Sequence, residues 1–150
     1  MSAGQAIAVD TSVAVKWFFD EPYSDRALSL RNAIRSGLYH AVAPDLIYAE
    51  FSNTVWKRVV FQGFDPEEGA GILATFASIP FRIIPSLALL DMAYRISVDQ
   101  RQNSYDALFL ALSVALETDL VTADEKFYRG VHQSFPRVCW LADWFPDLGL

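Results

Sequence analysis

Ala6-Ile7-Ala8-Val9-Asp10 is the stretch that decides the fold: four apolar residues and then, without a turn, an acid. An apolar run this short predicts a strand that is buried on both faces. Leu120-Val121-Thr122 has the same character, and Asp124 follows it closely. In open α/β sheets the carboxyl ends of parallel strands meet on one side, where ligands bind. We therefore expect Asp10 and Asp124 to lie near each other at the ends of two strands.

Outward from these two segments, short apolar runs alternate with longer stretches of helical periodicity. This alternation is typical of a mainly parallel sheet flanked by helices. Because no repeat or linker interrupts the 150 residues, we expect a single domain over 1–150. The expected strands are 6–9, 41–43, 81–84, 120–122 and 138–141, and the expected helices are 24–36, 45–61, 65–77, 87–99, 106–116 and 125–132.

The composition describes an ordered globular protein, with 53% apolar and 20% charged residues. No apolar stretch approaches the ~20 residues of a membrane span, so we expect no membrane association. The N-terminal residues 1–5 lack a basic region followed by an apolar one, which argues against a secretory signal and predicts a cytoplasmic protein.

The net charge of −6 argues against a protein that grips nucleic acid through a broad basic surface, because bare carboxylates repel phosphates. Divalent cations held by the acids would offset that repulsion locally. The basic residues that could then line the approach are Lys16, Lys57, Arg58, Lys126 and Arg129, whose alternative role is an ordinary surface of mixed charge.

Two further acids stand beside apolar positions of predicted helices. Asp106 opens the most apolar helix, so it needs compensation from a metal ion, a basic partner or the amides of the first helical turn. Ser104 is well placed to cap that helix, which gives Asp106 a structural alternative. Glu50 shares a helix face with Asn53 and Lys57, so its alternative is a surface network within the helix.

The strand-terminal aspartates have a structural alternative as well, since Asp residues cap helices and begin turns. Thr122 to Glu125 fits a capping box, in which the threonine and the glutamate satisfy the first amides of the following helix. That motif would leave Asp124 unused as a cap and available to a ligand.

The sequence motifs of several other kinds of active site are missing from the chain. His40, His132 and the lone Cys139 form no CxxC or HExxH motif, which argues against a zinc site, and Cys139 is expected in a buried strand. No Gly-rich phosphate loop or GxSxG elbow occurs. What remains is a set of carboxylates suited to Mg²⁺ or Mn²⁺, which prefer oxygen ligands.

Four short segments resemble, in this order, the signature of PIN-domain nucleases: Val9-Asp10-Thr11-Ser12, Ala49-Glu50-Phe51-Ser52-Asn53, Tyr105-Asp106-Ala107-Leu108 and Thr122-Ala123-Asp124. The likeness is greatest to the toxins of VapBC-type toxin–antitoxin modules. It implies a three-layer α/β/α sandwich with a central, mainly parallel sheet of four to five strands. It also implies an endoribonuclease that hydrolyses RNA phosphodiester bonds with Mg²⁺ or Mn²⁺ as cofactor.

The resemblance also assigns roles to individual residues. The family's four acidic positions, which act as catalytic residues and metal ligands, match Asp10, Glu50, Asp106 and Asp124. The residues expected to orient these acids, or alternatively to make local cap and turn bonds, are Ser12, Asn53 and Thr122.

Toxins of this kind usually form homodimers and are held by a cognate antitoxin whose tail crosses the active-site groove. The resemblance therefore implies a second copy and an antitoxin as partners, besides the RNA. The aromatic residues that could supply the apolar part of the antitoxin interface, unless they belong to the core, are Trp17, Phe18, Phe19, Trp56 and Phe61.

Two other functions fit part of the pattern. A haloacid-dehalogenase-like phosphatase also uses a strand-terminal aspartate with Mg²⁺, but it expects DxD where this chain has Asp10-Thr11-Ser12. A non-catalytic module could keep the fold and use the groove for RNA or a protein, although all four acids are present. A titration with Mn²⁺ would separate the enzyme from such a module, which need not bind the metal.

Overall fold

The sheet at the centre of the molecule consists of five parallel strands. The computed structural model describes residues 4–148, and in them the strand order is β3-β2-β1-β4-β5. Every predicted strand is present within two residues of its expected ends, so the prediction of a mainly parallel sheet is confirmed. The strands are β1 (Gln5–Val9), β2 (Tyr39–Pro44), β3 (Arg82–Ile84), β4 (Asp119–Thr122) and β5 (Val138–Trp140).

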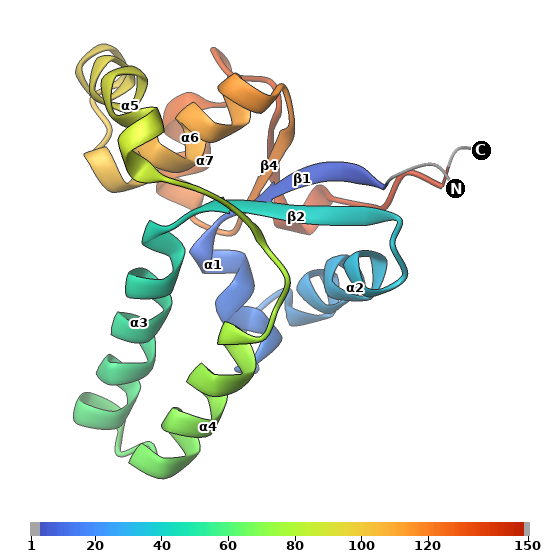
Figure 1. Ribbon diagram of the computed structural model, residues 1–150, viewed down its shortest axis with the longest axis vertical. Helices are drawn as coiled ribbons and strands as arrows, with labels where there is room; N and C mark the ends of the chain where they lie inside the picture. The colour runs from blue at the N-terminus through green and yellow to red at the C-terminus, as the bar shows by residue number, and fades with distance from the viewer. Residues whose placement is uncertain (1–3, 149–150) are drawn as a thin grey trace.

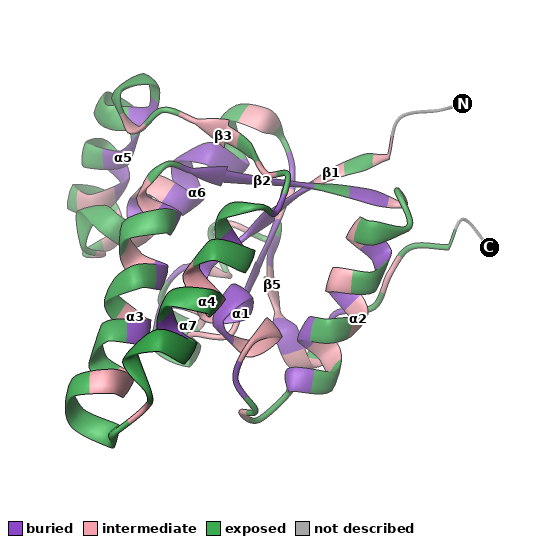
Figure 2. Ribbon diagram, turned by 60° about the horizontal axis from the view of Figure 1, so that its bottom comes forward, coloured by how far each residue is buried: buried purple, intermediate pink, exposed green. Residues whose placement is uncertain are grey.

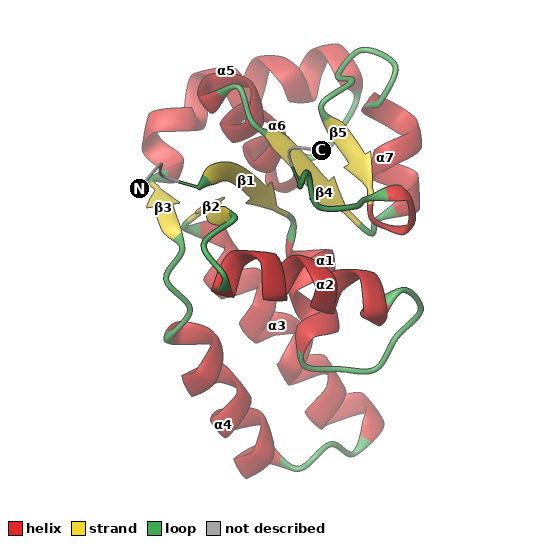
Figure 3. Ribbon diagram, turned by 90° about the vertical axis from the view of Figure 1, so that its right-hand side faces the viewer, coloured by secondary structure: helices red, strands yellow, loops and turns green. Residues whose placement is uncertain are grey.

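Helices cover both faces of the sheet. They are α1 (Thr11–Ala14), α2 (Ser24–Arg35), α3 (Leu46–Gln62), α4 (Pro66–Ala77), α5 (Ser86–Gln100), α6 (Ser104–Leu116) and α7 (Glu125–Val131), with two short 3-10 helices, η1 (Val15–Trp17) and η2 (Leu141–Asp143). Helices α1 to α4 lie on one side of the sheet, and α5 and α6 lie on the other (Figure 1, Figure 3). The expected α/β/α sandwich is thereby confirmed.

The helical segment directly after β1 is the element that the sequence does not predict. Helices α1 and η1 together span only residues 11–17, which is too short for a helical period to show in the sequence. The carbonyl of Asp10 accepts hydrogen bonds from the amides of Val13 and Ala14, so the chain turns into a helix as soon as β1 ends. Asp10 and the two hydroxyl residues after it therefore lie in one tight strand-to-helix turn.

The core lies on both faces of the three central strands, β2, β1 and β4, which are largely buried (Figure 2). Helix α6 contacts all three of these strands and, as predicted from its apolar sequence, is buried along most of its length. Helix α5 packs outside it. In the described part of the chain, no helix combines the length and apolar character that crossing a membrane would need.

Helices α3 and α4 form a hairpin on the other face of the sheet (Figure 1). Its inner side is aromatic: Phe51 and Phe76 stack with their ring centroids 3.8 Å apart and 7° between the ring planes. Gly63 ends α3 with a φ of 70°, a left-handed conformation that glycine adopts without steric cost, and the side chain of Asp65 caps α4. The hairpin thus fixes the orientation of α3, which carries Glu50.

Strand β1 pairs with β2 on one side and with β4 on the other. From this centre the chain first builds outward through β2 and β3, and later through β4 and β5. The carboxyl ends of β1 and β4 therefore flank the position where the strand order reverses, which is where ligands bind in open α/β sheets. Val9 lies beside Val121 in the register, so Asp10 and Thr122 leave the sheet as neighbours.

Candidate active site

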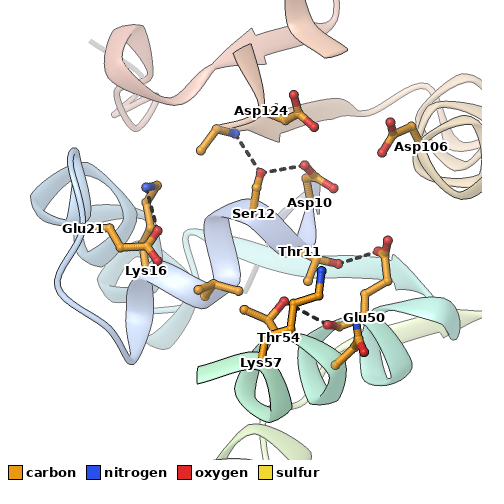
Figure 4. A pocket seen from close by; sticks show the side chains of 13 residues that line it. Asp10, Thr11, Ser12, Lys16, Glu21, Glu50, Thr54, Lys57, Asp106 and Asp124 are labelled. Atoms are coloured by element: carbon orange, nitrogen blue, oxygen red, sulfur yellow. Dashed lines mark hydrogen bonds and ion pairs between the residues drawn. The ribbon is translucent and has the colours of Figure 1, made fainter. Parts of the chain in front are cut away.

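A pocket of about 440 Å³ opens at this position, and all four predicted acids line it. Asp10 follows β1, Asp124 follows β4, Glu50 comes from α3 and Asp106 comes from the first turn of α6. Figure 4 shows these side chains around one space, with Asp10, Asp106 and Asp124 on one side and Glu50 on the other. The fold thus gathers four acids that are spread over more than 100 positions of the sequence.

Asp10 is the most buried of these acids, with 7% of its surface exposed. Its Oδ2 atom accepts hydrogen bonds from the hydroxyls of Ser12, at 2.6 Å, and Thr122, at 2.8 Å. Burial raises the pKa of Asp10, the two hydroxyls act in the opposite direction, and the nearby Asp124 raises the pKa further. Ser12 and Thr122 therefore hold this carboxylate through hydrogen bonds to one of its oxygens.

The same two hydroxyls also hold the turn after β4. Ser12 Oγ accepts a hydrogen bond from the amide of Ala123 at 2.9 Å, and Thr122 Oγ1 accepts one from the amide of Asp124 at 3.1 Å. The prediction of a capping box was wrong, because Asp124 itself caps α7 and its Oδ1 accepts from the amide of Phe127 at 3.0 Å. Only Oδ1 of Asp124 is used by the cap, so the other oxygen remains for a ligand.

Glu50 reaches across to α1. Its Oε1 atom accepts a hydrogen bond from the hydroxyl of Thr11 at 2.8 Å, whereas the alternative of a network within α3 is not seen. Burial is the main reason why the pKa of Glu50 is raised to about 7, with additional repulsion from Asp10 and Asp106. The hydroxyl of Thr11 lowers this pKa. Sequence reasoning missed Thr11, although it stands between two residues assigned to the site.

Asp106 is held by its own helix. Ser104 was predicted to cap α6, but the N-cap is Asn103. The Oδ1 of Asn103 accepts a hydrogen bond from the amide of Asp106 at 2.8 Å. Asn103 Nδ2 in return donates to Asp106 Oδ2 at 3.1 Å. Burial and the charges of Asp10 and Asp124 raise the pKa of Asp106 to about 6. The preference of asparagine for cap positions was the signal that could have identified this partner.

The remaining predicted residues divide between the pocket and the surface elsewhere. Asn53 and the two lysines Lys16 and Lys57 line the pocket. Lys16 Nζ forms an ion pair with Glu21 at 3.1 Å, and Arg58 pairs with the other oxygen of Glu21. The prediction that basic residues line the approach thus holds for Lys16 and Lys57, whereas Arg58, Lys126 and Arg129 are not among the pocket residues.

The predicted aromatic residues differ in exposure. Trp56 and Phe61 on α3 are 51% and 71% exposed, and their rings contact each other edge to face. Phe19 is buried, and its ring contacts Phe64 and the guanidinium of Arg58, so it belongs to the core, which was the other place considered for these residues. Trp17 and Phe18 are partly buried against the core.

Cys139 and His132, for which the sequence predicted no role in the site, lie away from the pocket. Cys139 lies in β5 as expected, but it is only partly buried. This burial raises the pKa of its thiol to about 11. His132 stacks on Tyr128, and its Nδ1 lies 3.1 Å from the carbonyl of that residue.

The donor set of the pocket suits a hard divalent cation, because it consists of carboxylates with hydroxyls behind them. As they stand, however, no three Asp, Glu, His or Cys side chains within residues 4–148 are close enough to coordinate one ion together. Each of the four acids is instead held by a hydrogen-bond donor of its own. Mg²⁺ usually keeps several waters and binds through one or two carboxylates, so the residues present fit such an ion.

Comparisons with known proteins agree with this architecture. A family model described as PIN domain matches residues 7–131. The chain is similar to VapBC2 from Rickettsia felis, whose crystal structure includes a DNA fragment from the promoter, with 18% identity, a TM-score of 0.63 and coverage of 91% of this chain and 97% of that chain. It is also similar to PAE2754 from Pyrobaculum aerophilum, with 16% identity, a TM-score of 0.61 and coverage of 93% and 91%. No curated protein matches the sequence.

Proposed function

Since the chain belongs to the PIN domain family, whose members are generally nucleases, we propose that it is a divalent-metal-dependent endoribonuclease and the toxin of a toxin–antitoxin module. The observation that carries this proposal is the set of four acids that line one pocket without any basic partner of their own. Within residues 4–148, no ion pair includes any of the four. Membership of this family also removes the phosphatase alternative.

Acids gathered without basic partners are costly, and the raised pKa values of Asp10, Glu50 and Asp106 express that cost. A cation would relieve it, so we assign Asp10, Glu50, Asp106 and Asp124 as ligands of Mg²⁺ or Mn²⁺, directly or through water. When bound, such an ion polarises a phosphate, lowers the pKa of water and stabilises charge on the departing oxygen. The proposed role of Ser12 and Thr122 is to hold Asp10 in position, and Asn53 is proposed to support Glu50 from the same helix.

The residues of the chain then have distinct tasks in hydrolysis. Glu50 lies across the pocket from the three aspartates, and its proposed task is to take the proton of the attacking water. Lys57 lines the pocket and has no ion-pair partner in the described part of the chain, so it can contact a phosphate of the RNA. Lys16 is already paired with Glu21 and contributes less free positive charge.

Exposed apolar side chains support the two proposed protein partners. Leu87, Leu90, Tyr94 and Val98 form one stripe along α5 and are between 60% and 82% exposed, which fits a homodimer interface. Trp56 and Phe61, which are exposed on the helix that carries Glu50, would give the antitoxin an apolar contact. A basic side chain of the antitoxin could pair with the acids in place of a metal ion. We place this module in the cytoplasm.

Cleavage of total RNA tests the proposal directly. The wild type should cut RNA with Mg²⁺ and not with EDTA, and Asp10→Asn and Asp106→Asn should lose activity while their circular dichroism is unchanged. Asp25→Asn, which removes an exposed acid from the first turn of α2, is the matched control and should stay active. Equal cleavage by all three variants would exclude the assigned acids. Binding of Mn²⁺ without cleavage of any RNA would indicate a non-catalytic module instead.

A further inference from the structure

A second hollow, of about 500 Å³, adjoins the acidic pocket. Lys16 and Ala123 line both, so the two lie side by side. The other residues of this second hollow are Pro22, Tyr23, Glu125, Tyr128, Arg129 and Trp140. We propose that it is a subsite for one nucleobase of a single-stranded RNA, next to the phosphate that is cut. This inference rests on the proposed ribonuclease function and adds a substrate contact to it.

Three aromatic rings give the hollow its flat surfaces. Trp140 contacts Tyr23 edge to face, with centroids 6.2 Å apart, and Tyr128 at 5.7 Å. The ring of His132, which does not line the hollow, stacks on Tyr128 with centroids 4.4 Å apart and so helps to hold that ring in place. All three rings of the hollow are partly or largely exposed. Proteins bind unpaired bases by stacking them on aromatic side chains of this kind, whichever base is present.

Tyr23 occupies a backbone position that favours glycine. Its φ is 67°, in the left-handed region, and 48% of its surface is exposed. An L-residue with a bulky side chain is rarely found in this conformation, and residues held there concentrate at functional sites. Burial does not explain the aromatic ring at this position, because nearly half of the residue is in solvent. The ring instead lines the hollow, where it can contact a ligand.

The charges of the hollow favour a neutral occupant. Arg129 is paired with Glu125 at 2.6 Å, and Lys16 is paired with Glu21 at 3.1 Å, so its cations are balanced. A phosphate would find little free positive charge here, whereas a nucleobase needs none. The covalent reach of a nucleotide then links the two sites: its base lies in the hollow and its phosphate lies at the acids. An aromatic side chain of a protein partner could also fill the hollow, but it carries no phosphate that would place it next to the acids.

The test compares the cleavage of an intact RNA with that of the same RNA lacking one base. Once the cut in a short single-stranded RNA has been mapped, matched substrates carry an abasic nucleotide immediately before or immediately after it. For the wild type, one of these substitutions should lower kcat/KM about 10-fold, which lies within the range of base–aromatic stacking. Tyr23→Leu and Trp140→Leu should lower kcat/KM on the intact RNA by a similar factor. Each of these variants should have the same kcat/KM on the intact RNA and on the abasic RNA.

Further variants make the result decisive. Tyr23→Gly removes the ring and suits the left-handed backbone, so it supplies a folded variant even if Tyr23→Leu is unstable. Tyr23→Phe should keep the dependence on the base, and Phe145→Leu, an exposed ring outside the hollow, is the control. Equal cleavage of intact and abasic RNA by the wild type would overturn the subsite and leave the ribonuclease standing.

Two other outcomes identify the remaining explanations. If the ring variants cut both RNAs like the wild type but resist inhibition by the antitoxin, the hollow binds the protein partner and the proposal is wrong. If the wild type cuts no RNA, the proposed function fails and this subsite fails with it.

Discussion

Glu50→Gln should stabilise the metal-free protein at alkaline pH although it damages the proposed active site. Burial above all raises the pKa of Glu50 from 4.5 to about 7, so at pH 8 the fold has to contain a charge that its surroundings disfavour. Glutamine has nearly the same shape and can still accept the hydrogen bond that Thr11 donates at 2.8 Å, but it carries no charge. The substitution therefore removes the cost and keeps the contact.

The size of the effect follows from the pKa. A rise from 4.5 to about 7 corresponds to about 3 kcal/mol between the charged and neutral forms. Glu50 is only partly buried, and solvent screens its charge, so we reduce the expected gain in unfolding free energy to about 1–2 kcal/mol. In a domain of this size that gain raises Tm by roughly 2–8 °C.

The direction of the pH dependence is fixed by linkage. Because the pKa of Glu50 is higher in the folded state than the value of 4.5 in the unfolded state, the folded wild type binds more protons, and its stability falls as the pH rises from 4.5 through about 7. The advantage of Glu50→Gln is therefore small at pH 4 and complete at pH 8. Saturating Mg²⁺ should abolish it, because the wild-type carboxylate then has a cation beside it.

Urea denaturation followed by circular dichroism measures this difference between pH 4 and pH 8, in EDTA and in Mg²⁺. Glu117→Gln, which changes an exposed glutamate beyond the end of α6, is the matched control and should show no such trend. If Glu50→Gln is less stable than the wild type at pH 8 in EDTA, the electrostatic reasoning about the pocket is wrong.

Three further predictions concern other parts of the molecule. Lys57→Gln should raise KM for RNA ~3–10-fold with little change in kcat and should reduce the salt dependence of binding by about 0.7 in the log–log slope, whereas Lys126→Gln, an exposed lysine outside the pocket, should change neither. Gly63→Ala should cost about 1 kcal/mol, measured by urea denaturation, because φ is 70° there; Gly71→Ala, inside exposed α4, should instead gain about 0.5–1 kcal/mol. Cys139 should react slowly with thiol reagents below pH 9, since the pKa of its thiol is about 11; rapid labelling of the folded protein at pH 8 would contradict this.

The sequence was sufficient for the sheet and for most helices because both depend on local patterns. Apolar runs such as 6–9 and 120–122 are long enough to mark a buried strand, and the helices of 12 or more residues show their period. The segment 11–17 carries no such signal, so α1 and η1 were missed. Their formation depends on the sheet beneath them, against which Val13, Ala14 and Val15 are buried.

That the four acids line one pocket was predictable from the sequence, but their individual contacts were not. The topology rule alone brings Asp10 and Asp124 together, since both follow parallel strands. Which donor holds which acid depends on distances of a few ångströms, so Thr11 and Asn103 were missed, and for Asp124 the sequence left open both a capping box without it and its own role as the helix cap, which the structure shows. The aromatic hollow was not foreseen, because Tyr23, Tyr128 and Trp140 lie far apart in the sequence and no shared pattern connects them.

The hydrogen bond from Thr122 to Asp10 joins positions 112 residues apart, and it has a consequence for synthesis of the protein. During translation, Asp10 leaves the ribosome long before β4 exists, and until then nothing can pair with the β4 side of β1. A nascent or prematurely terminated chain that ends before Asp119 therefore lacks both Thr122 and Asp124 and has no complete pocket. The order of the strands in the chain thus delays completion of the pocket until almost the whole protein has been synthesised.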